Sequence, residues 1–92
     1  MNCKAKGSRA ERRTIAVLEA AGYVCTKAGG SLGIFDVIGI GPNDVRCVQV
    51  KANGYLSELE RERILALVVP ANVSRECWRW VDRARQPLIE RL

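Results

Sequence analysis

The fold is decided by residues 34–51, whose sequence is IFDVIGIGPNDVRCVQVK. Two alternating runs, 34–40 and 45–51, flank the tetrapeptide GPND, whose composition is typical of a turn. This pattern predicts a β-hairpin in which Ile40 faces Val45.

Three polar side chains are expected on one face of this hairpin. The register places Asp36 opposite Gln49, and directly opposed residues have Cβ atoms about 5 Å apart. Lys51 follows on the face of Gln49, because side chains alternate along a strand. An acid, an amide oxygen and an ammonium that converge in this way form the layout of a metal-dependent phosphodiesterase site.

Length and charge narrow the class of protein further. The 92 residues are expected to form a single domain over residues 1–92, with a site in a surface groove and a tendency to oligomerise. Fifteen Lys and Arg against ten Asp and Glu give a net charge of +5, which favours a polyanionic partner.

The cysteine pattern and the lack of histidine argue against other chemistries. The chain has four cysteines and no histidine, and no Cys-x-x-Cys pair occurs, so neither a zinc site nor histidine acid/base catalysis is expected. Cys25, Cys47 and Cys77 lie among apolar residues, which favours buried, reduced thiols in a cytoplasmic protein. No signal peptide or membrane-length apolar run is apparent, so no membrane association is expected.

The rest of the chain predicts a mixed α/β order. We expect a helix over residues 8–21, a strand over residues 23–28, the hairpin, and a second helix that begins at Ser57 and ends before Pro70. For the tail over residues 73–92 we prefer two strands, although Cys77, Trp80, Val81 and Ala84 also fit helical spacing. The apolar side of the second helix is expected to comprise Leu59, Ile64, Leu65 and Val68. Trp78 and Trp80 could stack on bases, although core packing is the more common role of tryptophan in a small domain.

Glu11 lies on the apolar stripe of the first helix and needs an explanation. One reading is a capping box, in which Glu11 bonds back to the amide of Ser8. The other is that Glu11 reaches over the hairpin to help bind a cation beside Asp36. The second reading gains weight because an acidic site is already expected there.

The chain resembles the archaeal-type Holliday junction resolvases, which belong to the PD-(D/E)xK nuclease superfamily. The resemblance rests on short motifs that occur in the same order and span most of the chain. These are KGSRAER (6–12), AGGS (28–31), DVIG (36–39), CVQVK (47–51) and WRW (78–80).

The resemblance implies a restriction-endonuclease-like core, with a mixed central sheet, a hairpin that carries the site and flanking helices in the order α-β-β-β-α-β-β. It also implies a magnesium-dependent homodimer, with manganese as a substitute, that nicks four-way DNA junctions in recombination and repair. By position, Glu11, Asp36 and Gln49 would bind the metal, and Lys51 would be the catalytic lysine. Ser31 would be the loop serine near the scissile phosphate. We expect a location at the nucleoid or in the cytoplasm of a phage-infected cell.

Gln49 departs from the family pattern, which usually has Glu at this position. A glutamine still offers a carbonyl oxygen to a hard cation, but the loss of a charge should weaken magnesium binding. Two alternatives therefore remain open: a related nuclease for flaps, single strands or other branched DNA, and a catalytically silent DNA-binding module.

Basic residues cluster around the start of the first helix, beside the proposed site. Such a cluster can follow a DNA backbone, with an affinity that falls steeply as the salt concentration rises. The expected DNA-binding residues are Lys4, Lys6, Arg9, Arg12, Arg13 and Ser31.

Overall fold

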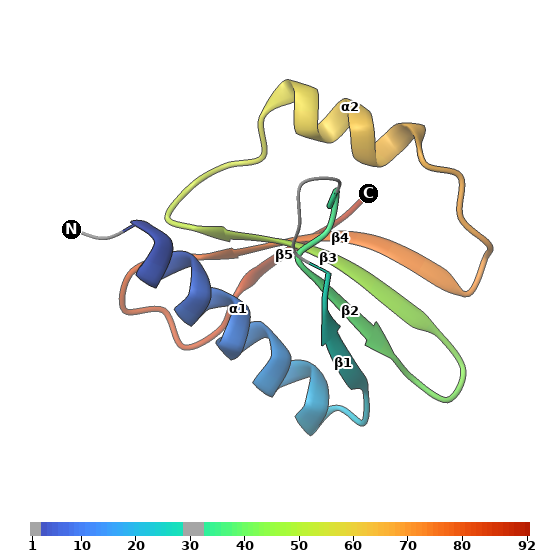
Figure 1. Cartoon of the computed structure of the whole chain (residues 1–92), viewed down its shortest axis with the longest axis horizontal. Helices are drawn as coiled ribbons and strands as arrows, with labels where there is room; N and C mark the ends of the chain where they lie inside the picture. The colour runs from blue at the N-terminus through green and yellow to red at the C-terminus, as the bar shows by residue number, and fades with distance from the viewer. Residues whose placement is uncertain (1–2, 29–32) are drawn as a thin grey trace.

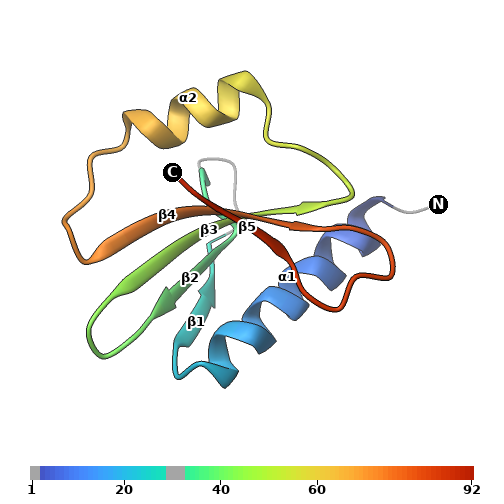
Figure 2. The same cartoon turned by 180° about the vertical axis from the view of Figure 1, so that it is seen from behind.

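A five-stranded mixed sheet with one helix on each face forms the domain (Figures 1 and 2). The structure, a computed structural model, describes residues 3–28 and 33–92, and only the backbone of residues 3–7. The helices are α1 (Cys3–Ala20) and α2 (Glu58–Ala66). The strands are β1 (Val24–Lys27), β2 (Val37–Ile40), β3 (Val45–Ala52), β4 (Val73–Trp80) and β5 (Leu88–Arg91).

The strands lie in sequence order across the sheet. All neighbours are antiparallel except β3 and β4, which are parallel and therefore need a crossover connection. The segment that contains α2 supplies this crossover. The predicted order of elements is confirmed, including the two final strands.

The main core lies between α1 and the sheet. Side chains from α1, β2, β3 and β4 meet there, and Trp78 is fully buried at its centre. The core residues are Ala10, Leu18, Val37, Val48, Trp78 and Trp80. The expectation that both tryptophans serve packing is therefore confirmed.

Helix α1 begins earlier than the sequence predicted. It starts at Cys3, so Ser8 is an interior position of the helix and not its N-cap. Of the two alternatives for Glu11, the capping box with Ser8 is therefore wrong.

Helix α2 packs loosely, although its start was predicted correctly. Ser57 is the N-cap and forms a capping box with Glu60. Ile64 is the one buried residue of α2. Leu59, Leu65 and Val68, the last of which follows the helix, were also expected to face inward. Those three side chains are exposed.

The cysteines match their expected role in part. Cys77 is buried, whereas Cys25 and Cys47 are only half-buried. Burial raises the pKa of all three thiols, so each favours the protonated form. Neither helix in the described part of the chain has the length and hydropathy needed to cross a bilayer.

Candidate active site

The hairpin has the predicted register, with one irregularity at Asp36. Ile40 pairs with Val45, and the pairing continues to Val37 and Val48. The backbone N–H of Asp36 also donates to the carbonyl of Val48, at 2.8 Å. Two consecutive residues thus face one, which is the arrangement of a β-bulge, and the direct pairing of Asp36 with Gln49 is wrong.

The bulge brings the Asp36 carboxylate against the backbone of β3. Its Oδ2 accepts a hydrogen bond from the N–H of Val50, at 2.8 Å. Val50 lies between Gln49 and Lys51 in the chain, so the Asp36 carboxylate lies beside both residues. This proximity comes from the bulge and not from the predicted cross-strand pair with Gln49. A bulge commonly redirects a side chain in this way near functional sites.

Burial raises the pKa of the Asp36 carboxyl above its ordinary value. The Val50 N–H and the charge of Lys51 act in the opposite direction, and the charge of Glu60 adds to the increase. Ionised Asp36 is therefore poorly solvated, and a cation nearby would stabilise it.

Lys51 is held by an acidic residue of α2. Its Nζ donates to Oε2 of Glu60 at 2.6 Å, and both side chains are mostly screened from solvent. Burial alone would raise the pKa of Glu60, but hydrogen bonds from Lys51 and Ser57 outweigh it and hold the pKa below the ordinary value. Glu60 was not predicted as a site residue, and its place in the Ser-x-x-Glu motif that begins at Ser57 is the local signal of a fixed carboxylate.

Glu11 approaches the same site from α1. Burial raises the pKa of Glu11, and the negative charge of Asp36 raises it further, while Lys27 lowers it. Because the capping box is absent, we explain the inward position of the half-buried Glu11 by its proximity to Asp36. Two acids that repel each other in this way favour either a shared proton or a cation.

Gln49 lies on the same strand face as Lys51, the face that α2 covers. Its Cα pairs with Cys77 of β4. The Gln49 side chain makes no hydrogen bond with the residues that the structure describes, so its amide oxygen can accept one.

The acids alone do not form a dense metal cage. Across residues 3–28 and 33–92, no group of three or more His, Cys, Asp or Glu is arranged to hold a metal ion. A cation site would therefore need the amide oxygen of Gln49 in addition to Glu11 and Asp36. Magnesium commonly binds few protein ligands and fills its remaining positions with water or phosphate oxygens.

The structure places part of the predicted DNA-binding set. Arg9 and Arg12 are exposed on α1, and Arg13 is half-buried against Trp80. Ser31 lies outside the described residues, as do the side chains of Lys4 and Lys6.

A second buried acid has a structural role that the sequence analysis missed. Glu76 is fully buried on the α1 face of β4 and accepts hydrogen bonds from Arg46, Ser74 and Trp78. Glu76, Trp78 and Trp80 occupy every second position of β4, so the sequence already placed Glu76 on the strand face that packs inward. Both carboxylate oxygens of Glu76 already accept hydrogen bonds, so Glu76 belongs to the core and not to the candidate active site.

Comparison with known proteins identifies the fold. No protein-family model matches the chain, and no curated protein matches it in sequence. The solved structure of Hjc, a Holliday junction resolvase from the archaeal hyperthermophile Archaeoglobus fulgidus, superimposes with a TM-score of 0.72 at 23% identity. The match covers 86% of this chain and 67% of that chain.

The chain has the resolvase fold. The central mixed sheet, the two flanking helices and their order are those expected of the restriction-endonuclease-like core. Within this fold, Asp36 directly precedes β2, Gln49 and Lys51 lie in β3, and α1 and α2 add Glu11 and Glu60.

Proposed function

We propose that the chain is a magnesium-dependent, structure-selective DNA endonuclease that nicks four-way junctions as a homodimer. The observation that carries the proposal is the Asp36 carboxylate, bonded to the Val50 N–H between Gln49 and Lys51, on a resolvase fold. The net charge of +5 is suited to a DNA substrate.

The residues present fit a magnesium ion. Glu11 and Asp36 are close enough for the charge of Asp36 to raise the pKa of Glu11, and a cation would relieve this repulsion. Gln49 would add a neutral oxygen ligand. When bound, magnesium would neutralise phosphate oxygens and lower the pKa of a bound water, and manganese would substitute.

Lys51 contributes positive charge at the same site. Its ammonium has three N–H donors, and one is engaged by Glu60 at 2.6 Å. The remaining donors are available to stabilise the negative charge that develops on the phosphate during hydrolysis. Glu60 fixes the direction of the lysine and is therefore a positioning residue.

The homodimer proposal rests on apolar side chains that this single chain leaves exposed. Leu59, Leu65, Leu67 and Val68 lie in or directly after α2 and are exposed, and Val68 reaches 91%. Several large apolar side chains exposed on one segment can form a subunit contact. A two-fold dimer would present two sites to the two symmetric strands of a junction.

A catalytically silent DNA-binding module is the second candidate. Gln49 removes one ligand charge, and the salt bridge to Glu60 already satisfies part of the charge on Lys51. Both features reduce the electrostatic attraction that the site has for a cation and a phosphate.

The test is cleavage of a labelled synthetic four-way junction beside matched duplex, flap and single-stranded DNA, with magnesium or manganese. Paired nicks in the junction that vanish in Lys51→Ala would support the resolvase activity. Cutting of flaps or single strands would assign the chain to a related nuclease. Tight junction binding without cleavage would favour the silent module.

A further inference from the structure

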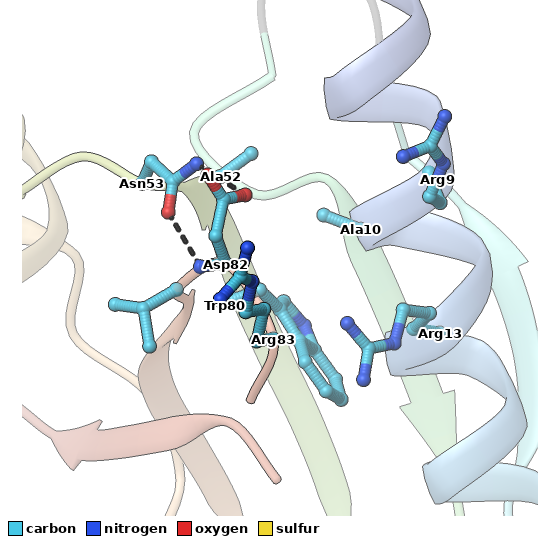
Figure 3. A pocket seen from close by; sticks show the side chains of 9 residues that line it. Arg9, Ala10, Arg13, Ala52, Asn53, Trp80, Asp82 and Arg83 are labelled. Carbon is cyan, nitrogen blue, oxygen red and sulfur yellow. Dashed lines mark hydrogen bonds between the residues drawn. The ribbon is translucent and has the colours of Figure 1, made fainter. Parts of the chain in front are cut away.

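A basic pocket lies at the end of β3, where Ala52 follows Lys51 in the chain. It has a volume of ≈ 130 Å³ and opens between α1, the end of β3 and the turn that joins β4 to β5 (Figure 3). Among the described residues that line it are three arginines and one acid, Asp82. The arginines are Arg9, Arg13 and Arg83.

Arg13 is held in place on the pocket wall. Its guanidinium carbon lies 4.1 Å from the centroid of the Trp80 ring, and its NH2 group donates to the carbonyl of Ala84 at 2.6 Å. Trp80 is itself fixed, because its indole N–H donates to Thr14 at 2.8 Å. A stacked guanidinium with N–H donors to spare loses little entropy when it binds an oxyanion.

Asn53 and Asp82 hold the opposite wall together. The Asn53 side-chain amide donates to Oδ1 of Asp82, and the Asp82 backbone N–H donates to Oδ1 of Asn53, both at 2.8 Å (Figure 3). These bonds connect the end of β3 to the turn that carries Arg83. These contacts of its neighbours fix the backbone at Arg83, whose side chain is exposed.

The backbone of this wall is unusual. Among the described residues other than glycine, Asn53 and Arg83 are the two with positive φ, at 58° and 66°. Asparagine adopts this conformation readily, but arginine does so with strain, and glycine would fit it better. Strain of this kind commonly occurs at functional positions, where the side chain itself is needed.

Within the described part of the chain, Arg9 and Arg83 have no polar partner. Neither makes a hydrogen bond or ion pair with the residues that the structure describes, whereas Asp82 is already bonded to Asn53. The pocket therefore has excess positive charge, and hydrogen bonds already hold Arg13, Asn53 and Asp82 in place around it.

The pocket also lies at the same level of α1 as the acidic site. Arg9 and Arg13 are two residues before and after Glu11, so they lie about 3 Å along the helix axis from it. A DNA strand that places one phosphate at the acidic site carries further phosphates at regular intervals.

We propose that this pocket binds a non-scissile phosphate of the DNA backbone, held by Arg9, Arg13 and Arg83. The inference rests on the proposed DNA substrate and adds a second anchoring point for the strand. Guanidinium groups suit this role because they can bind phosphate oxygens in a bidentate manner.

The test compares the binding of a four-way junction by wild type, Arg83→Gly and Arg85→Gly in EDTA, over a range of salt concentrations. Arg85 is the matched control, because it is an exposed arginine of the same turn that does not line the pocket. Loss of one charge-assisted phosphate contact should raise the Kd of Arg83→Gly about tenfold. The slope of log K against log salt should fall by about one unit.

A stability control accompanies the binding assay. Arg83→Gly should melt no lower than wild type, because glycine accepts the φ of 66° without strain. Weak binding can then not be assigned to unfolding. On binding of DNA, the indole N–H signal of Trp80 should also shift more than that of Trp78, which lies in the core against Glu76.

The outcomes separate the pocket from the nuclease activity. Equal losses in Arg83→Gly and Arg85→Gly, or no loss in either, would overturn the pocket and leave cleavage untouched. A protein that binds junctions through Arg83 but cuts nothing would fail as a nuclease and retain the pocket. A wild type that binds no DNA would overturn both.

Discussion

The Nζ of Lys51 lies 2.6 Å from Oε2 of Glu60, so the lysine of β3 is oriented by a helix that begins after it in the chain. The other oxygen, Oε1, accepts the backbone N–H of Ser57 at 2.9 Å. Glu60 therefore caps α2 and fixes the direction of Lys51 at the same time.

Glu60→Gln is expected to move the acidic limb of the pH–rate profile for junction cleavage to lower pH. The charge of Glu60 raises the pKa of Asp36, so its removal lets Asp36 ionise at a lower pH. The maximal rate should fall roughly tenfold, because Lys51 is less firmly oriented. Glutamine also forms capping boxes, so the helix should persist.

Glu58→Gln is the control for this variant. Glu58 is an exposed acid in the same first turn of α2, and the salt bridge to Lys51 does not involve it. Its pH–rate profile should match that of wild type. Equal shifts in the two variants would mean that helix charge in general, and not the contact with Lys51, controls Asp36.

Asp36→Asn should stabilise the metal-free protein at neutral pH. Burial raises the pKa of Asp36 above its unfolded value, so the folded state binds this proton more tightly than the unfolded state does. The ionised acid therefore costs stability above that pKa, and the cost disappears as the pH falls through it. Asparagine removes the charge and can still accept the Val50 N–H.

Thermal unfolding in EDTA as a function of pH measures this effect. The Tm of Asp36→Asn should exceed that of wild type by a few degrees at neutral pH, and the difference should close in acid. Magnesium should narrow the difference at neutral pH by stabilising wild type alone. A lower Tm for the variant in EDTA at neutral pH would contradict the account.

Arg46→Met should destabilise the fold by about 3–5 kcal/mol, because it leaves the buried charge of Glu76 without its partner. Two hydrogen bonds join these side chains, at 2.9 and 2.7 Å, and Glu76 is fully buried. The exposed pair of Arg61 and Glu90 is the comparison, and Arg61→Met should cost much less stability, because solvent screens an exposed ion pair. Urea denaturation would measure both, and similar losses would show that burial of Glu76 does not matter.

Gln49→Glu should restore a charged ligand at the site. Ligand charge is a main determinant of affinity for hard cations, so half-saturation by magnesium should occur at about tenfold lower concentration. A titration of junction cleavage with magnesium measures this directly. An unchanged midpoint would place Gln49 outside the metal-binding set.

The hairpin could be predicted from the sequence because the residues that determine it are close together in the chain. The GPND turn and the alternation on either side of it determine the register, and Ile40 does face Val45. The bulge at Asp36 escaped prediction because it depends on how the strand meets the loop before it and on the hydrogen bond to Val50.

The start of α1 was misplaced because a capping motif was given more weight than helix propensity. Residues 3–6 are mostly good helix formers, and the helix passes through Gly7 at a cost of about 1 kcal/mol relative to alanine. The extension removed the capping role of Glu11 and so strengthened its assignment to the acidic site.

Glu60 was missed because its contact with Lys51 depends on how a crossover helix is placed over the sheet. The sequence around Ser57 predicts the helix start but gives no information on which strand the helix covers. The apolar residues of α2 were misassigned for a related reason. Their periodicity predicts a buried side, but this single chain buries only Ile64 within the helix.

The most direct test is the rate of four-way junction nicking in magnesium by wild type and Asp36→Asn, with junction binding measured in parallel. We expect paired nicks by wild type and a rate at least a hundredfold lower for the variant, because the metal-binding charge is gone, with junction binding retained. Equal nicking by both proteins would contradict the assignment of this site, and no nicking by wild type would contradict the nuclease itself.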